Sequence, residues 1–344
     1  MTRTIAVVCT SRPSWAKLLP VCEALRDAGL QVDLIAAAYA TTHARGGCLD
    51  IMAADGWPPT TVLHAALDAN TLETSALTTG FLTIRLAGHF EQSKPDGVIV
   101  NHDRHETISA SIAASYLNIP VLHTGGGERS GSIDDRVRWA NTMLADWHCC
   151  ANVEAYGRIV AAGVPIDRVW VSGCPSMDVA RLAQLDPPVT RTELDGYGTG
   201  ASVDPEQPFA MVLQHSNTEH ADTAARDLAH AIDHARAYPR IIWWPSSDTG
   251  HDEASKWLRE SAPADAKLVR TLPPRRFLRL LGQASLAVGN SSALIREGSY
   301  LGVKRIILGD RQRGRSWSEN ASTLYGDGYA APRVAEVARA MVGA

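Results

Sequence analysis

Residues 97–106 read GVIVNHDRHE, and this stretch decides the fold. Its first four residues are apolar and mostly β-branched, which is typical of a strand buried inside a parallel sheet. Residues 107–117 then carry apolar positions at helical spacing, Ile108 and Ile112 among them. The polar residues 101–106 therefore lie in the connection between a strand and the following helix. In an open α/β sheet, ligands bind at that carboxyl end of a strand, so the pattern predicts a functional site.

A second polar cluster follows the next predicted strand. That strand covers residues 119–124 (IPVLHT), and residues 125–135 after it read GGGERSGSIDD. Three successive glycines allow the backbone to approach a ligand closely, and Glu128, Asp134 and Asp135 bring carboxylates to the same predicted rim. For the first cluster, residues 101–106, a solvated loop with a helix cap is the alternative interpretation. Two consecutive strands with acid-rich carboxyl ends favour a site.

The rest of the chain repeats the alternation of strand and helix. In the first half, further strands are predicted at residues 4–9, 32–38, 147–151 and 168–173. In the second half, they are predicted at residues 209–213, 241–245, 286–290 and 305–308. Segments with helical spacing separate these strands, so the sequence predicts an α/β fold with two Rossmann-like domains facing a cleft.

The domain boundaries follow from a change in composition. Residues 185–208 are rich in turn-forming residues, and we place the boundary after Pro175. The predicted domains are residues 1–175 and 176–330, followed by a helix at 331–344 that packs back on the first domain. A length of 344 residues agrees with two domains. The first strand–turn–helix lacks Gly-x-Gly-x-x-Gly and the Walker pattern, so a dinucleotide site is not expected there.

Composition excludes several classes of function. An apolar content of 45% and a charged content of 20% are ordinary for a globular protein. The net charge of -4 gives no indication of nucleic-acid binding. The six cysteines are scattered without a Cys-x-x-Cys pair, which favours reduced thiols in the cytoplasm. No signal peptide is recognisable and no apolar run approaches ~18 residues, so no membrane span is expected.

Several of these motifs together resemble the UDP-N-acetylglucosamine 2-epimerases. The motifs are NHDR at 101–104, IPV at 119–121, GGE at 126–128, GSIDD at 131–135, GNSS at 289–292 and DRQRGR at 310–315. The GGE and SIDD pieces are closer to the hydrolysing branch, and the resemblance extends over most of the chain. It implies a glycosyltransferase-B-like architecture, and a homodimer or homotetramer.

The resemblance also implies an activity. A hydrolysing 2-epimerase converts UDP-N-acetylglucosamine, or a related UDP-N-acetylhexosamine, and water to N-acetylmannosamine, or a related sugar, and UDP. The reaction would proceed by elimination to a glycal and rehydration, with no metal or other cofactor, because there is no net redox change. Two alternatives stay open. One is a glycosyltransferase or nucleotide-sugar hydrolase on the same scaffold, and the other is a non-catalytic nucleotide-sugar binder.

The resemblance assigns roles to individual residues. The acid/base candidates are Asp103, Glu128 and Asp134. The candidates for binding UDP and its diphosphate are Arg12, Lys17, His215, Ser291, Ser292, Glu297, Arg311 and Arg315. The sugar-pocket candidates are His43, Gly125 and Trp139. Free N–H groups at the strand-to-helix turn of Ser291 and Ser292 would suit a diphosphate, and the Glu297 carboxylate can accept both protons of a vicinal diol.

The sequence departs from the hydrolysing branch at two sugar-side positions. The branch commonly reads His-x-His-Gly-Gly-Glu where residues 123–128 read HTGGGE, and Ile-Arg-His where residues 137–139 read VRW. Gly125 and Trp139 thus stand in place of histidines. A glycine leaves space and a tryptophan fills it, so we expect a donor with a different sugar and Trp139 stacking against it. The alternative is that both positions drifted in an enzyme that keeps the common substrate.

Overall fold

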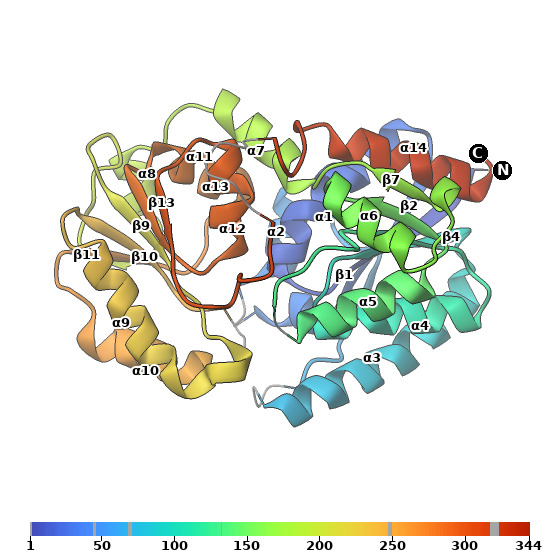
Figure 1. Ribbon diagram of the computed structural model, residues 1–344, viewed down its shortest axis with the longest axis horizontal. Helices are drawn as coiled ribbons and strands as arrows, with labels where there is room; N and C mark the ends of the chain where they lie inside the picture. The colour runs from blue at the N-terminus through green and yellow to red at the C-terminus, as the bar shows by residue number, and fades with distance from the viewer. Residues whose placement is uncertain (1, 44–45, 68–70, 132, 247–249, 317–322) are drawn as a thin grey trace. The chain divides into compact units, whose positions relative to one another are not determined.

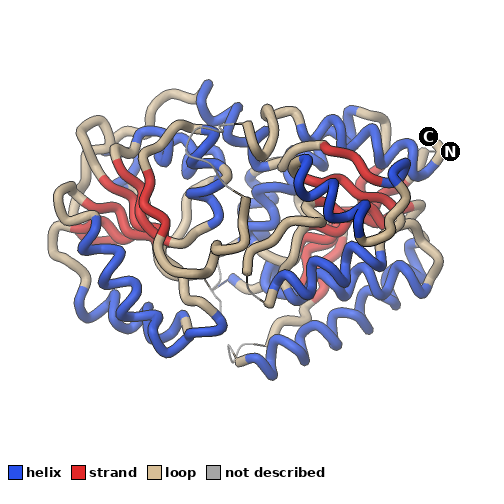
Figure 2. Tube along the Cα trace, in the orientation of Figure 1, coloured by secondary structure: helices blue, strands red, loops and turns tan. Residues whose placement is uncertain are grey.

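The computed structural model describes residues 2–344 except 44–45, 68–70, 132, 247–249 and 317–322. The chain forms two compact units (Figure 1), each a twisted sheet with helices on its faces (Figure 2). The first unit contains residues 1–129, 134–178 and 325–344, and the second contains residues 130–133 and 179–324. The predicted α/β fold class with two Rossmann-like domains is confirmed.

The first sheet is parallel throughout. Among the described residues it has seven strands in the order β3-β2-β1-β4-β5-β6-β7. Their bounds are Thr4–Cys9 for β1, Gln31–Ala37 for β2, Thr61–Leu63 for β3, Gly97–Asn101 for β4, Val121–Thr124 for β5, Trp147–Cys150 for β6 and Val169–Val171 for β7. The strand order reverses between β1 and β4. That reversal is the point at which α/β sheets open a crevice for ligands.

Helices cover both faces of this sheet. They are α1 (Arg12–Asp27), α2 (Cys48–Ala54), α3 (Leu72–Ser93), α4 (Ile108–Tyr116), α5 (Asp134–Leu144), α6 (Val153–Ala161) and α14 (Ala330–Val342). Alternate residues of each strand point to opposite faces. Ile5 and Val7 therefore pack in one core with α1 and α14, while Ala6 and Val8 pack in another with α3 and α4.

The C-terminal helix α14 belongs to the first unit, where it packs beside α1 (Figure 1). Its first N–H groups have no partners within the helix, as at any helix N-terminus. The buried carboxylate of Asp178 accepts from the backbone N–H groups of Ala330 and Ala331, both at 2.9 Å. Asp178 thus fixes the entry of α14 and favours it through the helix dipole.

The second sheet is mostly parallel. In the described part of the chain its order is β13-β12-β9-β10-β11-β8. Its strands are β8 (Thr199–Gly200), β9 (Ala210–Leu213), β10 (Arg240–Trp243), β11 (Ala266–Val269), β12 (Leu286–Gly289) and β13 (Arg305–Ile307). Its α-helices are α8 (Arg191–Asp195), α9 (Ala224–His234), α10 (His251–Ser261), α11 (Pro274–Gln283), α12 (Ser292–Ile295) and α13 (Glu297–Tyr300), and α7 (Ser176–Leu185) leads in from the first unit. The strand order reverses between β9 and β12.

Three features differ from the sequence-based expectations. Helix α3, with 22 residues, was not predicted, because apolar residues lie on its exposed side as well as on its buried side, where Thr78 interrupts the apolar pattern. The segment with helical spacing between the predicted strands at 286–290 and 305–308 forms two short helices, which are separated at Arg296 (φ -82°, ψ -73°). The turn-rich stretch after Pro188 supplies β8, which pairs antiparallel with β11. Within the described residues, no helix is long and apolar enough to cross a membrane.

Candidate active site

The first-unit site lies at the carboxyl ends of β1 and β4, on either side of the reversal in strand order. Ser11 and Arg12 follow β1, and residues 102–106 follow β4. Arg12 opens α1, and burial lowers the pKa of its guanidinium from the ordinary value. A cation that burial has removed from water favours an anionic partner.

Arg138 on α5 is the centre of the acidic cluster. Its side chain is 1% exposed, and it donates hydrogen bonds to Asp103 Oδ2, to Asp135 Oδ1 and, at 2.8 Å, to the backbone carbonyl of Glu128. A guanidinium carries five donors in a planar fork, so one residue can tie three segments together. Arg138 was not among the predicted site residues. Its spacing of three residues from Asp135 on one helix was the available signal.

His102 holds a backbone conformation that non-glycine residues rarely adopt, with φ at 63°. Hydrogen bonds from three neighbouring elements maintain it. They join His102 N to Thr124 O (2.9 Å), His123 Nε2 to His102 O (2.9 Å), Asn141 Nδ2 to His102 O (3.4 Å) and His102 Nδ1 to Asn101 Oδ1 (2.6 Å). This turn presents the next residue, Asp103, to Arg138.

The expectation of vacant space beside Gly125 is wrong. A Cβ atom added to Gly125 would lie 2.9 Å from both Cε1 and Nδ1 of His102. Gly125 also has φ at 78°, which disfavours any L side chain. The imidazole of His102 therefore occupies the volume that a side chain at 125 would need. Trp139 is partly exposed on α5, next in sequence to Arg138.

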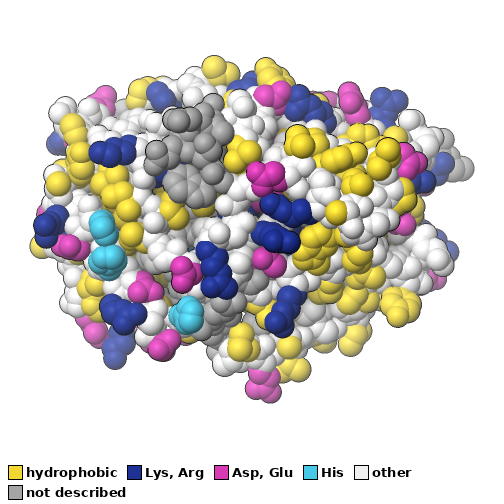
Figure 3. Space-filling model, in the orientation of Figure 1, with side chains coloured by type: hydrophobic (Ala, Val, Ile, Leu, Met, Phe, Trp, Pro, Cys, Tyr) yellow, Lys and Arg dark blue, Asp and Glu magenta, His cyan; other side chains and the backbone are white. Residues whose placement is uncertain are grey.

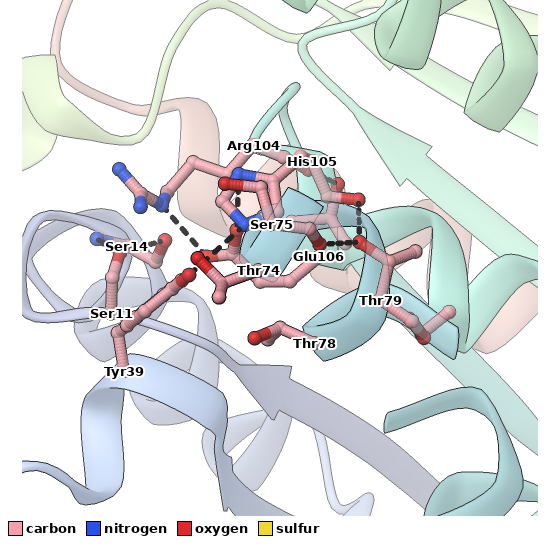
Figure 4. Close-up of polar contacts among 12 residues, drawn as sticks. Ser11, Ser14, Tyr39, Thr74, Ser75, Thr78, Thr79, Arg104, His105 and Glu106 are labelled. Atoms are coloured by element: carbon pink, nitrogen blue, oxygen red, sulfur yellow. Dashed lines mark hydrogen bonds and ion pairs between the residues drawn. The ribbon is translucent and has the colours of Figure 1, made fainter. Parts of the chain in front are cut away.

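A buried charged network lies beside these residues (Figure 4). Glu106 is fully buried and pairs with Arg104 (2.7 Å) and His105 (3.2 Å). Burial alone would raise the pKa of Glu106, but the charges of Arg104 and His105 hold it below the usual value. Tyr39 contacts both partners, since its hydroxyl lies 3.3 Å from His105 Nε2 and its ring lies under the Arg104 guanidinium. Arg104, His105 and Glu106 lie in the 101–106 cluster that the sequence predicted as a site, although none of them was given a role of its own, and Tyr39 was not predicted.

The other first-unit candidates are spread more widely. Lys17 is half-buried on α1, and Asp134 is the first residue of α5. His43 has a side chain that is 91% exposed, with Nε2 3.7 Å from Asp50. The three hydrogen bonds given above for Arg138 go to Asp103, Asp135 and Glu128, and not to Asp134. Ser132, in the middle of the GSIDD motif, lies outside the described residues.

In the second unit, Asn290 joins the two strands at the reversal of strand order. Its amide clamps the backbone of His215, accepting from His215 N at 2.8 Å and donating to His215 O at 2.8 Å. The imidazole of His215 is fixed in turn, because its Nδ1 accepts from Ser246 N at 3.0 Å. Neutral His215 therefore carries its proton on Nε2, which makes that atom a donor.

The arginine-rich loop of residues 310–315 forms hydrogen bonds to the turn at Asn290. Gln312 Nε2 and Arg311 Nη1 donate to the carbonyl of Asn290, at 3.1 and 3.4 Å. The buried side chain of Arg315 donates from Nε to Gln312 Oε1 at 2.6 Å. Two candidate phosphate-binding cations are thus attached to the strand end that carries the Gly289–Ser292 motif.

The expected cradle of free backbone N–H groups at that motif is partly wrong. The N–H groups of Asn290 and Ser291 both donate to Leu213 O at 3.2 Å, because β9 runs alongside β12. Ser291 caps α12 by accepting from Ala293 N at 3.3 Å, and Ser292 begins a helix of only 4 residues. The side-chain cations and the donor of His215 therefore have the larger part in any anion binding here.

Glu297 is 7% exposed at the start of α13. Its Oε2 atom is buried and has no hydrogen-bond partner within the described part of the protein. Buried carboxylate oxygens nearly always have a donor. An unsatisfied oxygen in this position is therefore consistent with a ligand that brings hydroxyl groups.

Comparison with known proteins agrees with this geometry. The paired Rossmann-like units are of the glycosyltransferase-B-like class, and a family model described as UDP-N-acetylglucosamine 2-epimerase matches residues 59–327. The chain belongs to that family, as its motifs predicted.

The chain is 30% identical over 234 residues to a UDP-N,N'-diacetylbacillosamine 2-epimerase (hydrolyzing) of Legionella pneumophila, an alignment that covers 67% of this chain and 60% of the relative. It is 29% identical to a UDP-N-acetylglucosamine 2-epimerase of Neisseria meningitidis serogroup B, over 65% of this chain and 58% of the relative. The chain thus spans about 60% of the length of these curated relatives.

The crystal structure of Methanocaldococcus jannaschii UDP-GlcNAc 2-epimerase in complex with UDP-GlcNAc and UDP has the same fold. Its TM-score is 0.79 at 16% identity, and the match covers 98% of this chain and 99% of that one.

We predict that acid will destabilise the protein between about pH 6.5 and pH 4. His123 and His148 are buried side by side on β5 and β6, and burial lowers the pKa of each to about 4. As the pH falls through 6.5, the unfolded chain binds these protons while the folded chain does not. Stability is therefore complete above pH 6.5 and falls by up to roughly 3 kcal/mol for each histidine as the pH approaches 4.

Urea unfolding at several pH values measures this effect. His148→Gln should reduce the loss of stability on going from pH 7 to pH 5, whereas His234→Gln, at an exposed position, should leave it unchanged. An unfolding free energy that is equal at pH 7 and pH 5 would contradict the assignment of two buried neutral imidazoles.

We also predict that Gly125→Ala destabilises the protein through contact with His102. Gly302 supplies a matched control, because its φ is 71° but nothing lies within 4 Å of its added Cβ. Both substitutions incur the backbone strain, and only the one at 125 incurs overpacking, so Gly125→Ala should cost about 1–3 kcal/mol more. In a His102→Ser background this excess should disappear, which unfolding curves of the four variants would measure. Equal costs at 125 and 302 would be the contrary result.

Proposed function

We propose that this protein is a hydrolysing nucleotide-sugar 2-epimerase, which converts a UDP-N-acetylhexosamine and water to the free 2-epimeric sugar and UDP. The observation that carries the proposal is the ion pair of Asp103 with buried Arg138 at the carboxyl end of β4. Membership of the 2-epimerase family and similarity to a hydrolysing relative support it.

The first step is an elimination. A base removes the proton from carbon 2, the bond between carbon 1 and the diphosphate oxygen breaks, and an unsaturated glycal and UDP form. Asp103 suits the role of base, since its ion pair with Arg138 favours the carboxylate form. Cations near the leaving diphosphate stabilise the charge that develops on it.

The second step is a hydration. Water adds its hydroxyl group to carbon 1, and an acid returns a proton to carbon 2 on the opposite face, which inverts that centre. Glu128 and Asp134 are the candidates for moving these protons, because one carboxylate cannot serve both faces of the sugar. Asp135 is bound to the same Arg138, and we assign it no proton transfer.

The second unit supplies the groups for UDP. Glu297, with its unsatisfied buried oxygen, suits the ribose hydroxyls, and Nε2 of His215 suits a diphosphate oxygen. Arg311 and Arg315, held to the Asn290 turn, add positive charge. In the first unit, Arg12 is a further candidate for the diphosphate and Lys17 for the nucleotide-sugar. We propose uridine as the nucleoside because the similar proteins are named for UDP-sugars.

We further propose that the sugar differs from N-acetylglucosamine. The expected histidine at 125 is replaced by glycine, and the imidazole of His102 fills that volume from a different strand end. Trp139 stands in place of a second histidine. The side chains that would contact the sugar therefore differ from the two histidines of the hydrolysing branch in both position and chemical type. The Legionella pneumophila relative is named for UDP-N,N'-diacetylbacillosamine, which makes that compound the first alternative donor to test.

Thermal unfolding with UDP tests the nucleotide assignment. At ~100 times its dissociation constant, UDP should stabilise the protein by roughly 2.7 kcal/mol. Glu297→Gln should reduce this stabilisation because the amide offers one uncharged acceptor oxygen where the carboxylate offers two, and Glu206→Gln, exposed in the same unit, should not. If saturating UDP fails to raise the melting temperature of the wild type, the nucleotide assignment is wrong.

Incubation with donors in deuterium oxide tests the reaction. The wild type should release UDP and a free sugar that carries deuterium at carbon 2. Asp103→Asn and Glu128→Gln should each slow turnover by ~10²–10⁴-fold while UDP still stabilises the protein. Asp167→Asn, at an exposed position, is the control.

The donors to compare are UDP-N-acetylglucosamine and UDP-N,N'-diacetylbacillosamine. Cleavage without deuterium would favour a nucleotide-sugar hydrolase or glycosyltransferase, and UDP binding with no turnover would favour a non-catalytic binder. Turnover of UDP-N-acetylglucosamine at an ordinary enzyme rate of ~1–10³ per second would contradict the altered sugar alone.

A further inference from the structure

Three side chains in the first unit form a row that has no part in the reaction proposed above. They are Tyr39, His105 and Glu106, which we call the tyrosine relay. Tyr39 lies in a short 3-10 helix directly after β2, and the other two residues follow β4. Since β1 lies between β2 and β4 in the sheet, the two segments meet across the carboxyl end of β1 (Figure 4). The relay thus lies at the reversal of strand order, where α/β sheets bind ligands.

Glu106 supplies a fixed negative charge at the inner end of the relay. On the face of the protein that Figure 3 shows, acidic and basic side chains are interspersed at the surface. Glu106 differs from these because it is completely buried, with its Oε1 atom 2.7 Å from Nε of Arg104. Burial raises the pKa of Glu106, but the charges of Arg104 and His105 lower it to below the ordinary value. Glu106 is therefore a buried carboxylate, whose charge acts strongly on the imidazole beside it.

The imidazole of His105 lies between this carboxylate and a phenol. Its Nδ1 atom is 3.2 Å from Oε2 of Glu106, and its Nε2 atom is 3.3 Å from the hydroxyl oxygen of Tyr39. A carboxylate oxygen is an acceptor only, so it favours the neutral imidazole that carries its proton on Nδ1. Nε2 then accepts from the Tyr39 hydroxyl. A hydroxyl, a base and a carboxylate that orients the base are the parts of a general proton-transfer device.

The ring of Tyr39 is held from two sides. The guanidinium carbon of Arg104 lies 5.6 Å from the ring centre, and the imidazole of His105 lies at 72° to the ring with 5.6 Å between their centres. Tyr39 is 7% exposed, whereas the side chain of His105 is 31% exposed. Tyr39 is therefore positioned before any reaction begins, which lowers the cost of reorganisation. His105 has the better access to the solvent for exchanging a proton.

We propose that Tyr39 is a further catalytic residue, which takes a proton from the water that adds to carbon 1 of the glycal. The inference rests on the proposed function. As the water oxygen bonds to carbon 1, one of its O–H bonds breaks and that proton passes to the phenol oxygen of Tyr39. The proton that Tyr39 carried passes to Nε2 of His105. The electron pair of the carbon 1–carbon 2 double bond forms the new bond to hydrogen at carbon 2, with the proton supplied by an acid.

The charges balance at the end of this step. The acid that protonates carbon 2, for which Glu128 and Asp134 are the candidates, becomes a carboxylate. His105 becomes an imidazolium, and its new charge faces the carboxylate of Glu106. That attraction favours the transfer. Because its side chain is partly exposed, His105 can then return the proton to the solvent.

The number of proton transfers indicates why the relay serves the hydration and not the elimination. The elimination removes one proton, from carbon 2, and Asp103 is the base proposed for it. The hydration needs both an acid for carbon 2 and a base for the attacking water. Asp103 is bound to Arg138 on α5, whereas the relay reaches the end of β1 from β2. The first unit thus presents two separate proton-transfer groups at this strand end, as a reaction with two separate bases requires.

Single-turnover kinetics with enzyme in excess over the donor tests the inference, using a donor that the wild type turns over. Tyr39→Phe removes one oxygen atom and keeps the ring. UDP and the unsaturated glycal should form at the wild-type rate, and release of the free sugar should slow by ~10²–10⁴-fold, so that the glycal accumulates. UDP should stabilise the variant as it stabilises the wild type. Tyr116→Phe, 86% exposed on α4, makes the same change elsewhere and should behave as the wild type.

A second variant tests whether Tyr39 acts through His105. His105→Gln should also accumulate glycal, because Tyr39 then has no imidazole to receive its proton. The double variant of Tyr39→Phe and His105→Gln should be no slower than the slower single variant, since residues that act as one unit are not additive. His234→Gln, at an exposed position in the second unit, is the control.

Several outcomes would overturn the inference. Free sugar released by Tyr39→Phe at the wild-type rate would exclude the relay from the reaction. Equal slowing of UDP and sugar formation would give Tyr39 a structural role or a role in the elimination. Effects that multiply in the double variant would separate Tyr39 from His105. Failure of the proposed function is a different result, because it would be seen in the wild type, which would then release no UDP or a sugar without deuterium.

Discussion

The buried guanidinium of Arg138 is the constraint on which the first-unit site depends. Removing a cation from water is unfavourable unless carboxylates and carbonyls compensate it. Arg138 therefore requires Asp103, Asp135 and the Glu128 carbonyl to be where they are, at the ends of three different elements. The same requirement makes the cluster specific. Removing one partner would leave the buried cation without full compensation for its lost hydration. The positions of the two carboxylates and the carbonyl therefore depend on one another.

Both units use an asparagine at the reversal of strand order. In the first unit, Oδ1 of Asn101, the last residue of β4, accepts from His102 and from Thr124 on β5. In the second, Asn290 follows β12 and clamps the backbone of His215 after β9. An amide offers both donors and acceptors without charge, so it can join two diverging strand ends without adding to the electrostatic field. Each sheet thus orients a histidine through a neutral group.

The sequence predicted the strand ends well and the contacts between them poorly. Apolar runs followed by polar clusters are local patterns, so the positions of β4 and β5 follow from the residue types at 97–106 and 119–128 alone. Arg138 and Asp103 are 35 residues apart, and nothing in the spacing of either predicts their ion pair. Helix α3 was not predicted because its apolar residues do not follow the helical periodicity of a helix with one buried face. Periodicity detects one buried face, and this helix has a second apolar face.

His102 and Gly125 show why the role of a residue cannot be transferred position by position. Both residues have positive φ, at 63° and 78°, and their Cβ directions converge on one small volume. Only one of them can carry a side chain there. A comparison of single positions registers a histidine lost at 125, whereas the structure shows an imidazole that enters the same volume from β4. The strained backbone of His102 is maintained by four hydrogen bonds, so the imidazole cannot withdraw as a mobile surface side chain would. In the proposed sugar pocket, a ligand would meet this filled volume and the nitrogen atoms of the imidazole.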